Sequence, residues 1–224
     1  MRHLAATLGL LTFLVIPPGC SCPSFLRVEP GTPLARAAAA GNVELMRTLL
    51  HTTPLPDQLD GHGLTPMVWA ARSGQVGSIH VLLAAGADPD LRDGHVNGWT
   101  PLMHAIHKSQ DLAALALLEG GAGVNVSAPN GTTALMMAAG EGNLRLTREL
   151  LERGADPRAE THNGTTTLTN AVASGDPDIV KALLDRAPDL RLKDTLNDSL
   201  CLLSARLRGE EEIVTMVTHS PIRQ

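Results

Sequence analysis

The stretch that decides the fold spans residues 65–88 and reads TPMVWAARSGQVGSIHVLLAAGAD. It opens with a Thr-Pro pair, carries an alanine five positions after the threonine and a glycine nine positions after it, and reaches a Leu-Leu pair seventeen positions after it. The same order of features returns before and after this stretch at a nearly constant interval. Internal periodicity of this length indicates a chain built from stacked supersecondary units.

Six copies of the pattern follow one another, and their first residues lie 33, 35, 33, 33 and 33 positions apart. These first residues are Thr32, Thr65, Thr100, Thr133, Thr166 and Ser199. Five positions on stand Ala37, Ala70, Ala105, Ala138, Ala171 and Ser204, and nine positions on stand Gly41, Gly74, Ser109, Gly142, Gly175 and Arg208. The apolar pairs run from Leu49-Leu50 and Leu82-Leu83 to Met216-Val217. So many features in one register predict a repeat protein.

Each recurring residue type has a physical role in a pair of short helices. A threonine hydroxyl caps the first helix by accepting from an otherwise unpaired backbone N–H. Proline next to it costs nothing, because the first helical N–H has no partner within the helix. The alanine column lets neighbouring first helices approach closely, and glycine ends that helix in a left-handed conformation. No single unit can bury its apolar face, so we expect stability to come from stacking.

The period and its motifs resemble the ankyrin repeat, whose signature includes a Thr-Pro-Leu start and about 33 residues per unit. The endings Gly86-Ala87-Asp88-Pro89 and Gly154-Ala155-Asp156-Pro157 are similar to the usual ending of that repeat. The resemblance covers residues 32–219, followed by a tail at 220–224. It implies an all-α repeat solenoid of helix-turn-helix units with short β-hairpin tips and about six repeats including caps.

Several departures from the pattern mark particular parts of the array. Residues 53–63 are rich in proline and aspartate and replace the usual ending, so the first loop is expected to be irregular. Two extra residues fall between Asp93 and Gly98 and lengthen one tip. The last repeat lacks the Thr-Pro start and has Arg208 where glycine is usual. Terminal repeats are expected to be atypical because they cap the core.

The N-terminal segment predicts export. Residues 1–19 have a short basic start and a mostly apolar run of thirteen residues that ends at Pro17-Pro18, a pattern typical of a secretory signal peptide. A membrane-spanning helix needs roughly 20 apolar residues, more than this run provides. Gly19 before Cys20 resembles a bacterial lipoprotein signal, which implies lipidation of Cys20 at the start of a linker over 20–31. Plain cleavage is the alternative, so the mature protein is expected to be periplasmic, envelope-anchored or secreted.

Composition argues against several classes of function. The formal net charge is −5, so the chain lacks the excess of basic residues that nucleic-acid binding requires. Aromatic residues make up only 2 %, too few for a platform on which single strands stack. Three cysteines are too few for a disulfide framework. The glycines follow the repeat period, and no phosphate-binding loop is needed to explain them.

No constellation of residues predicts catalysis, a metal or a cofactor. His104 and His107 lie three apart on an expected helix and could face the same way. A metal site needs a third ligand and usually a fourth, and none is placed by the spacing. His104 shares its column with Trp69 and Met137, so we expect it to pack in the core. The chain is therefore predicted to be a binding protein and not an enzyme.

The ankyrin resemblance implies a concave surface, made of tips and first helices, that binds a protein. The positions it assigns to partner binding are His62, Leu64, Arg72, Trp99, His107, Lys108, Asn130, Glu141, Arg153 and His162, and its wider surface adds Gly61, Ser73, Asn97, Thr132, Asn163 and Arg186. Trp99 is the best candidate for an anchor, because tryptophan and arginine dominate binding hot spots. The alternative is that Trp99 packs on its own tip.

Three alternative functions would each use this surface. The first is an exported interaction module, expected to be monomeric, whose partner is a protein of the envelope, the periplasm or the exterior. The second is an immunity-like inhibitor that neutralises an enzyme or toxin. The third is a secreted virulence effector. Fold alone does not choose among them, since function depends on the site.

Overall fold

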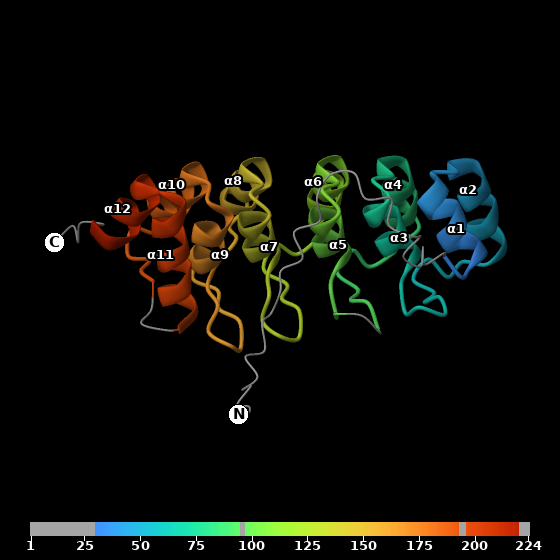
Figure 1. Cartoon of the computed structure of the whole chain (residues 1–224). Coiled ribbons are helices and arrows are strands. Elements are labelled where there is room, and N and C mark those ends of the chain that lie inside the picture. The colour runs from blue at the N-terminus through green and yellow to red at the C-terminus, as the bar shows by residue number, and fades with distance from the viewer. Residues whose placement is uncertain (1–29, 95–96, 193–195, 220–224) are drawn as a thin grey trace, which may run out of the picture.

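The computed structural model describes residues 30–94, 97–192 and 196–219. The predicted signal peptide, Cys20 and the tail at 220–224 lie outside the described residues. Within them the chain forms twelve helices, arranged as six successive pairs (Figure 1). They are α1 (Pro33–Ala40), α2 (Val43–Thr52), α3 (Pro66–Arg72), α4 (Val76–Ala84), α5 (Pro101–His107), α6 (Asp111–Glu119), α7 (Ala134–Gly140), α8 (Leu144–Glu152), α9 (Thr167–Ser174), α10 (Pro177–Arg186), α11 (Leu196–Arg208) and α12 (Glu211–His219).

The threonines begin the first helix of five repeats as the sequence predicts. Each Oγ1 accepts a hydrogen bond of 3.1–3.3 Å from the backbone N–H three residues later, at Thr32, Thr65, Thr100, Thr133 and Thr166. The glycines nine positions on have positive φ angles between 71° and 78°, at Gly41, Gly74, Gly142 and Gly175. Ser109 takes the same left-handed conformation with φ 54°. These local signals set the length of each first helix.

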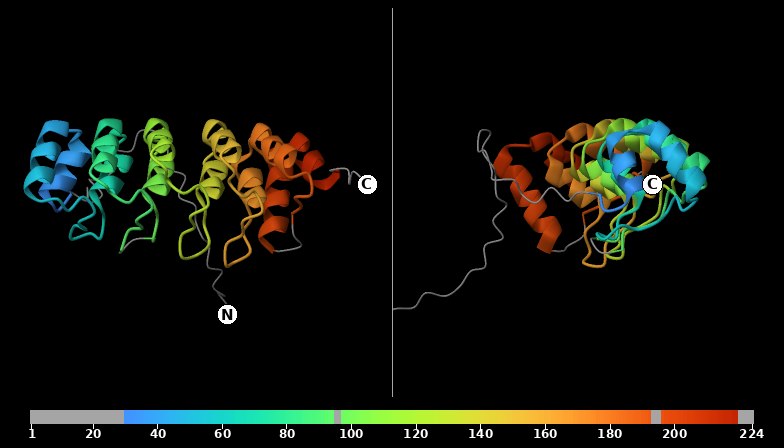
Figure 2. Two further views of the ribbon diagram at one scale, coloured as in Figure 1. Left: turned by 180° about the vertical axis from the view of Figure 1, so that it is seen from behind. Right: turned by 90° about the vertical axis from the view of Figure 1, so that its right-hand side faces the viewer.

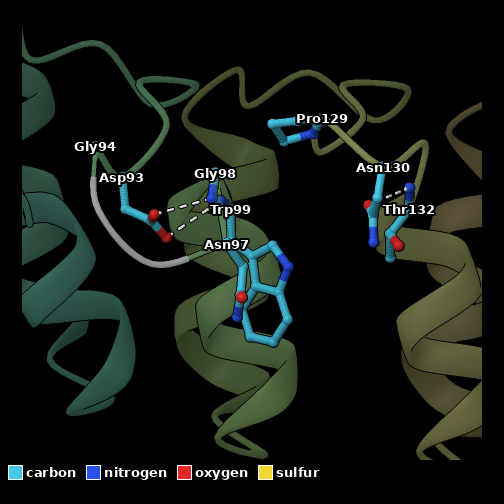
Figure 3. A pocket seen from close by; sticks show the side chains of 8 residues that line it. All are labelled: Asp93, Gly94, Asn97, Gly98, Trp99, Pro129, Asn130 and Thr132. Atoms are coloured by element: carbon cyan, nitrogen blue, oxygen red, sulfur yellow. Dashed lines mark hydrogen bonds between the residues drawn. The ribbon is translucent and has the colours of Figure 1, made fainter.

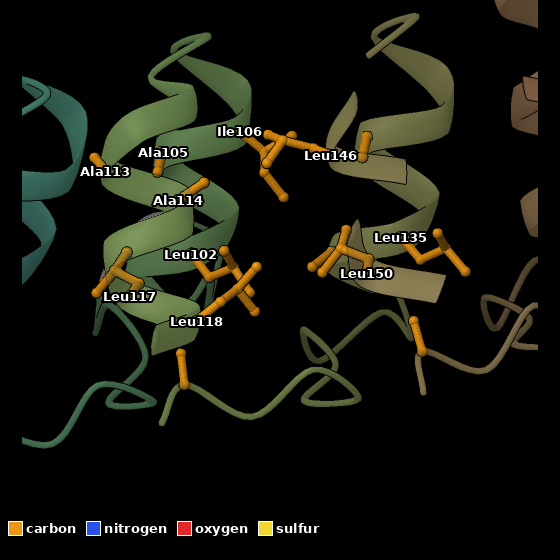
Figure 4. Packing of buried hydrophobic residues seen from close by; sticks show 14 of the residues in the cluster. Leu102, Ala105, Ile106, Ala113, Ala114, Leu117, Leu118, Leu135, Leu146 and Leu150 are labelled. Atoms are coloured by element: carbon orange, nitrogen blue, oxygen red, sulfur yellow. The ribbon is translucent and has the colours of Figure 1, made fainter. Parts of the chain in front are cut away.

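The helices stack in two layers. The odd-numbered helices pack side by side in one layer and the even-numbered helices form the other (Figures 1 and 2). The alanine column is fully or almost fully buried between neighbouring first helices. Leu117 of α6 and Leu150 of α8 are likewise buried, and one continuous apolar cluster joins the repeats (Figure 4). No helix of the described chain is both long and apolar enough to cross a membrane.

The loops that join successive repeats project to one side of the stack and form its tips (Figures 1 and 2). In the described parts of the chain these tips contain no strands. Two isolated antiparallel bridges remain, between Ser127 and Thr133 and between Glu160 and Thr166. The expected β-hairpins are therefore reduced to single bridges in the fourth and fifth repeats.

The structure corrects the alignment of the last repeat by one residue. Ala205, not Ser204, occupies the alanine column with no exposed surface, and Gly209, not Arg208, has the left-handed conformation with φ 79°. The N–H of Glu210 donates to the carbonyl of Ala205 at 3.0 Å, and in the first four repeats the carbonyl of the alanine column accepts the equivalent bond. Ala205 follows Ala171 by 34 positions, and Gly209 follows Gly175 by 34, so a strict period of 33 fails there. Val217 accordingly takes the place of the first leucine of the pair.

Candidate partner-binding surface

A buried aspartate organises the tip of the third repeat. One carboxylate oxygen of Asp93 accepts from the N–H of Gly98 at 2.9 Å, and the other accepts from the N–H of Trp99 at 3.1 Å (Figure 3). The second oxygen also lies 2.8 Å from Nε2 of His104 on α5. These contacts tie the tip to the first turns of the helix that follows it. The backbone of Trp99 is thereby held in one position.

The charge state of this cluster follows from its surroundings. Burial raises the pKa of Asp93, but the hydrogen bonds from His104, Gly98 and Trp99 outweigh it and hold that pKa below its usual value. Burial lowers the pKa of His104 to about 4, against the opposing effect of Asp93. At neutral pH His104 is therefore neutral and donates its Nε2–H to the carboxylate. Its Nδ1 is buried and has no hydrogen-bond partner in the described part of the chain.

A buried aspartate also organises the tip of the second repeat, but its side-chain partner is a tryptophan. Asp60 accepts from the backbone N–H groups of Gly31, His62 and Leu64 at 2.8–3.1 Å, and from the indole Nε1 of Trp69 at 2.8 Å. This turn draws Leu64 into a small apolar cluster, where its exposed fraction is 2 %. The prediction that Leu64 faces a partner is therefore wrong, because the aspartate folds its backbone inwards.

A hollow of about 560 Å³ lies between the tips of the third and fourth repeats. It is lined by Asp93, Gly94, Asn97, Gly98, Trp99, Pro129, Asn130 and Thr132 (Figure 3). A second hollow of about 320 Å³ continues from it towards the fifth repeat and shares Asn130 and Thr132 with it. The two hollows form one groove along the tips, and Trp99 stands at one end of it.

Among the described residues, the third and fourth tips lack a backbone hydrogen bond that the tips on either side make. The N–H of Gly94 donates to the carbonyl of Gly63 in the previous tip, and the N–H of His162 donates to the carbonyl of Asn130, each at 2.9 Å. Pro129 stands 33 positions before His162 and has no N–H to donate. Among the described residues no backbone hydrogen bond joins the third tip to the fourth.

Trp99 packs on histidines of its own repeat, and one of these, His107, reaches the fourth repeat. Its ring packs edge-on against His104 and His107, with centroid distances of 5.4 and 5.2 Å. Nδ1 of His107 lies 3.5 Å from a carboxylate oxygen of Glu141, at the end of α7. The side chains of His107 and Glu141 are each exposed by more than 40 %, so this contact lies at the surface.

Comparison with known proteins identifies the fold family. A family model described as ankyrin repeats (3 copies) matches residues 3–93 and 113–194, well over half of the chain. The chain belongs to the ankyrin-repeat family. A solved ankyrin repeat domain from Acinetobacter baumannii AYE is 28 % identical with a TM-score of 0.73, over 84 % of this chain and 97 % of that one. No curated protein matches the chain.

Ankyrin repeats generally mediate protein–protein interaction and are typically not enzymes. Several predicted positions of this ankyrin array lie at its surface, namely His62, His107, Lys108, Asn130, Glu141 and His162. Arg72 is half-buried, and its guanidinium carbon lies 5.5 Å from the centre of the Trp69 ring. Trp99, His107, Asn130 and Glu141 come together around the groove.

Arg153 does not join the groups around the groove. It follows α8 in the layer of even-numbered helices, and its side chain donates to Glu149 at 2.6 Å and to the carbonyl of Leu118 at 3.2 Å. It therefore ties the fourth ankyrin repeat to the third. In the described chain no three His, Cys, Asp or Glu side chains are grouped so that they could hold a metal ion.

Sequence reasoning missed the two aspartates that shape this ankyrin surface. Asp60 and Asp93 are 33 positions apart, and each is followed by glycine, so a signal was present. Their partners are different residue types in one column, Trp69 and His104, and only their common hydrogen bond to aspartate reveals the shared role. Core packing was the correct prediction for His104, but the carboxylate beside it was not foreseen.

Proposed function

We propose that this chain is an exported module that binds a partner protein through its tips and its odd-numbered helices, with Trp99 as the anchor. The observation that carries the proposal is the setting of Trp99. The indole borders an open hollow, its backbone is held by Asp93, and two histidine rings brace it. An aromatic side chain fixed before binding loses little conformational entropy on contact, which favours affinity.

Charged side chains around Trp99 would orient the partner. Arg72 at the end of α3 and Lys108 at the end of α5 supply positive charge, and Glu141 at the end of α7 supplies negative charge. Exposed charges at the rim of an interface affect association rate and orientation more than affinity. We therefore expect the partner to present acidic groups near Lys108, which lines neither hollow.

Export is the second element of the proposal and depends on residues 1–19. Cleavage after this segment would release the array beyond the inner membrane, and lipidation of Cys20 would keep it at a membrane surface. Intact mass distinguishes these forms, because acyl chains add mass to a protein that begins at Cys20. A protein that retains Met1 in the cytoplasm would contradict export.

The test of binding uses the full-length chain with a C-terminal affinity tag, expressed in a bacterial host, to capture and identify its partner. Trp99→Ala should then weaken binding of the purified partner by more than about 1 kcal/mol. Leu112→Ala is the matched control, because Leu112 is an apolar side chain on α6 with 65 % exposure, in the other layer. Equal affinity for Trp99→Ala and the parent protein, with equal thermal stability, would refute the anchor.

A further inference from the structure

The tips carry one asparagine per repeat at a constant interval. Asn97, Asn130 and Asn163 are 33 positions apart, each is exposed, and each is followed by a glycine with positive φ. All three line the groove described above, Asn97 and Asn130 in its first hollow and Asn130 and Asn163 in its second. The array therefore presents a row of three carboxamides, one from each of three successive tips, along the groove.

The carboxamides offer donors to a ligand. Oδ1 of Asn130 accepts from the N–H of Thr132 at 3.0 Å, and Oδ1 of Asn163 accepts from the hydroxyl of Thr161. In the described chain the amide nitrogens of all three asparagines have no hydrogen-bond partner. A ligand that satisfies this row has to supply acceptors at regular intervals.

The groove selects against charged ligands. Among the described residues that line it, the charged ones are Asp93 and Glu141, the first engaged by three donors and the second facing His107. The remaining lining is amide, hydroxyl and apolar, with Trp99 at one end and Met137 further along. Main-chain carbonyls are uncharged acceptors that suit such a lining.

The spacing of the three asparagines indicates which backbone conformation a bound segment of the partner would have. Packed helices lie about 8–10 Å apart, which sets the distance between equivalent groups of neighbouring repeats. A polyproline II segment has three residues per turn and a rise of about 3.1 Å, so equivalent carbonyls recur every ~9 Å. Its carbonyls make no internal hydrogen bonds. An α-helix uses its own carbonyls, and a strand alternates sides at each ~3.3 Å step, so neither matches the row.

We propose that the tips bind an uncharged polyproline II segment of the partner. Asn97, Asn130 and Asn163 each donate from Nδ2 to a main-chain carbonyl at every third residue of the segment. Trp99 packs against a proline ring at one end, as aromatic side chains do in other grooves that bind such segments. This inference rests on the proposed binding function and specifies the chemistry of the partner.

The direct test is a titration of the ¹⁵N-labelled full-length protein with acetylated, amidated nonaproline, followed by NMR. The expected result is a shift of the side-chain amide signals of Asn97, Asn130 and Asn163 and of the Trp99 indole signal. A helical alanine-rich peptide of equal length should leave these signals in place. Absence of shifts with nonaproline, or equal shifts with the helical peptide or with a neutral oligosaccharide, would overturn the proposal.

Variants separate this inference from the binding function itself. Asn130→Ala should weaken nonaproline binding about three- to tenfold, the range expected for one hydrogen bond. Gln58→Ala removes an exposed amide that does not line the groove and should change nothing. Circular dichroism checks that Asn130→Ala is still folded. If this variant binds nonaproline with unchanged affinity, the role of the asparagine row is refuted. If Trp99→Ala nevertheless abolishes capture of the partner, the proposed binding function stands.

Discussion

Replacing His104 by glutamine should remove a pH dependence from the stability of the array. The pKa of His104 falls from 6.5 in the unfolded chain to about 4 in the folded protein, because burial disfavours the charged ring. Between these two values the unfolded chain binds the additional proton. Stability is therefore complete above pH 6.5 and declines as the pH falls towards 4. Asp93 remains ionised in this window, because its own pKa is lowered from 3.8.

The magnitude follows from the shift. One pKa unit corresponds to about 1.4 kcal/mol, so lowering the pH from 7 to 4.5 should cost the parent protein about 2–3 kcal/mol through His104. Glutamine does not titrate, so His104→Gln should lose less stability over the same interval by about that amount. At pH 7 the variant should be less stable than the parent protein, because a longer amide replaces a well-placed imidazole between Asp93 and Trp99.

Urea unfolding followed by circular dichroism at several pH values between 4.5 and 7.5 gives the required free energies. His80→Gln is the control, because His80 is an exposed histidine on α4 and its replacement should leave the pH profile of the parent protein unchanged. Equal pH profiles for His104→Gln and the parent protein would refute the reasoning, since the buried ring would then titrate as it does in the unfolded chain.

Three further substitutions test the packing. Asp60→Ala should cost about 2–4 kcal/mol in thermal unfolding, because it leaves the indole N–H of Trp69 and several backbone donors unpaired; a smaller loss than 1 kcal/mol would argue against the turn. Gly131→Ala should destabilise the array more than Gly154→Ala, although both glycines have φ near 88°. At Gly131 the added Cβ would lie 2.9 Å from the backbone of the next tip, whereas at Gly154 it would meet nothing. Equal melting temperatures of the two variants would contradict this close approach. Leu207→Ser should change stability by less than about 0.5 kcal/mol, since Leu207 is 80 % exposed, and a large loss would show that α11 packs differently.

The predictions that succeeded depend on neighbours in sequence. Thr65 caps α3 through the N–H of Val68, three residues away, so the capping residue and its partner appear together in the sequence. The alanine column was read correctly in five repeats because a small residue is required wherever two first helices meet. It failed at Ser204 because the buried Ala171 and Ala205 are 34 positions apart, so a fixed period of 33 points one residue too early.

The predictions for the surface were less successful because exposure depends on contacts between distant residues. Leu64 follows the pattern of a surface position, yet Asp60 closes the turn around it and buries it. Arg153 is exposed as its pattern predicts, but its side chain also reaches a carbonyl of the neighbouring repeat, 35 residues earlier, and does not join the groups around the groove. Neither contact leaves a trace in the local pattern of apolar and polar residues.

The sequence by itself determined the repeat and the start of the first helix in five repeats, because caps, turns and the apolar period are short-range and recur along the chain. Only the tertiary structure decided where the hollows lie. The first is lined by Asn97 and Trp99 from one tip and by Pro129 and Asn130 from the next, and these residues come together only when the repeats stack. Likewise Asp93 and His104 form a pair only because the tip folds back onto α5. A site assembled from neighbouring repeats depends on distances between them, and those distances exist only in the folded stack.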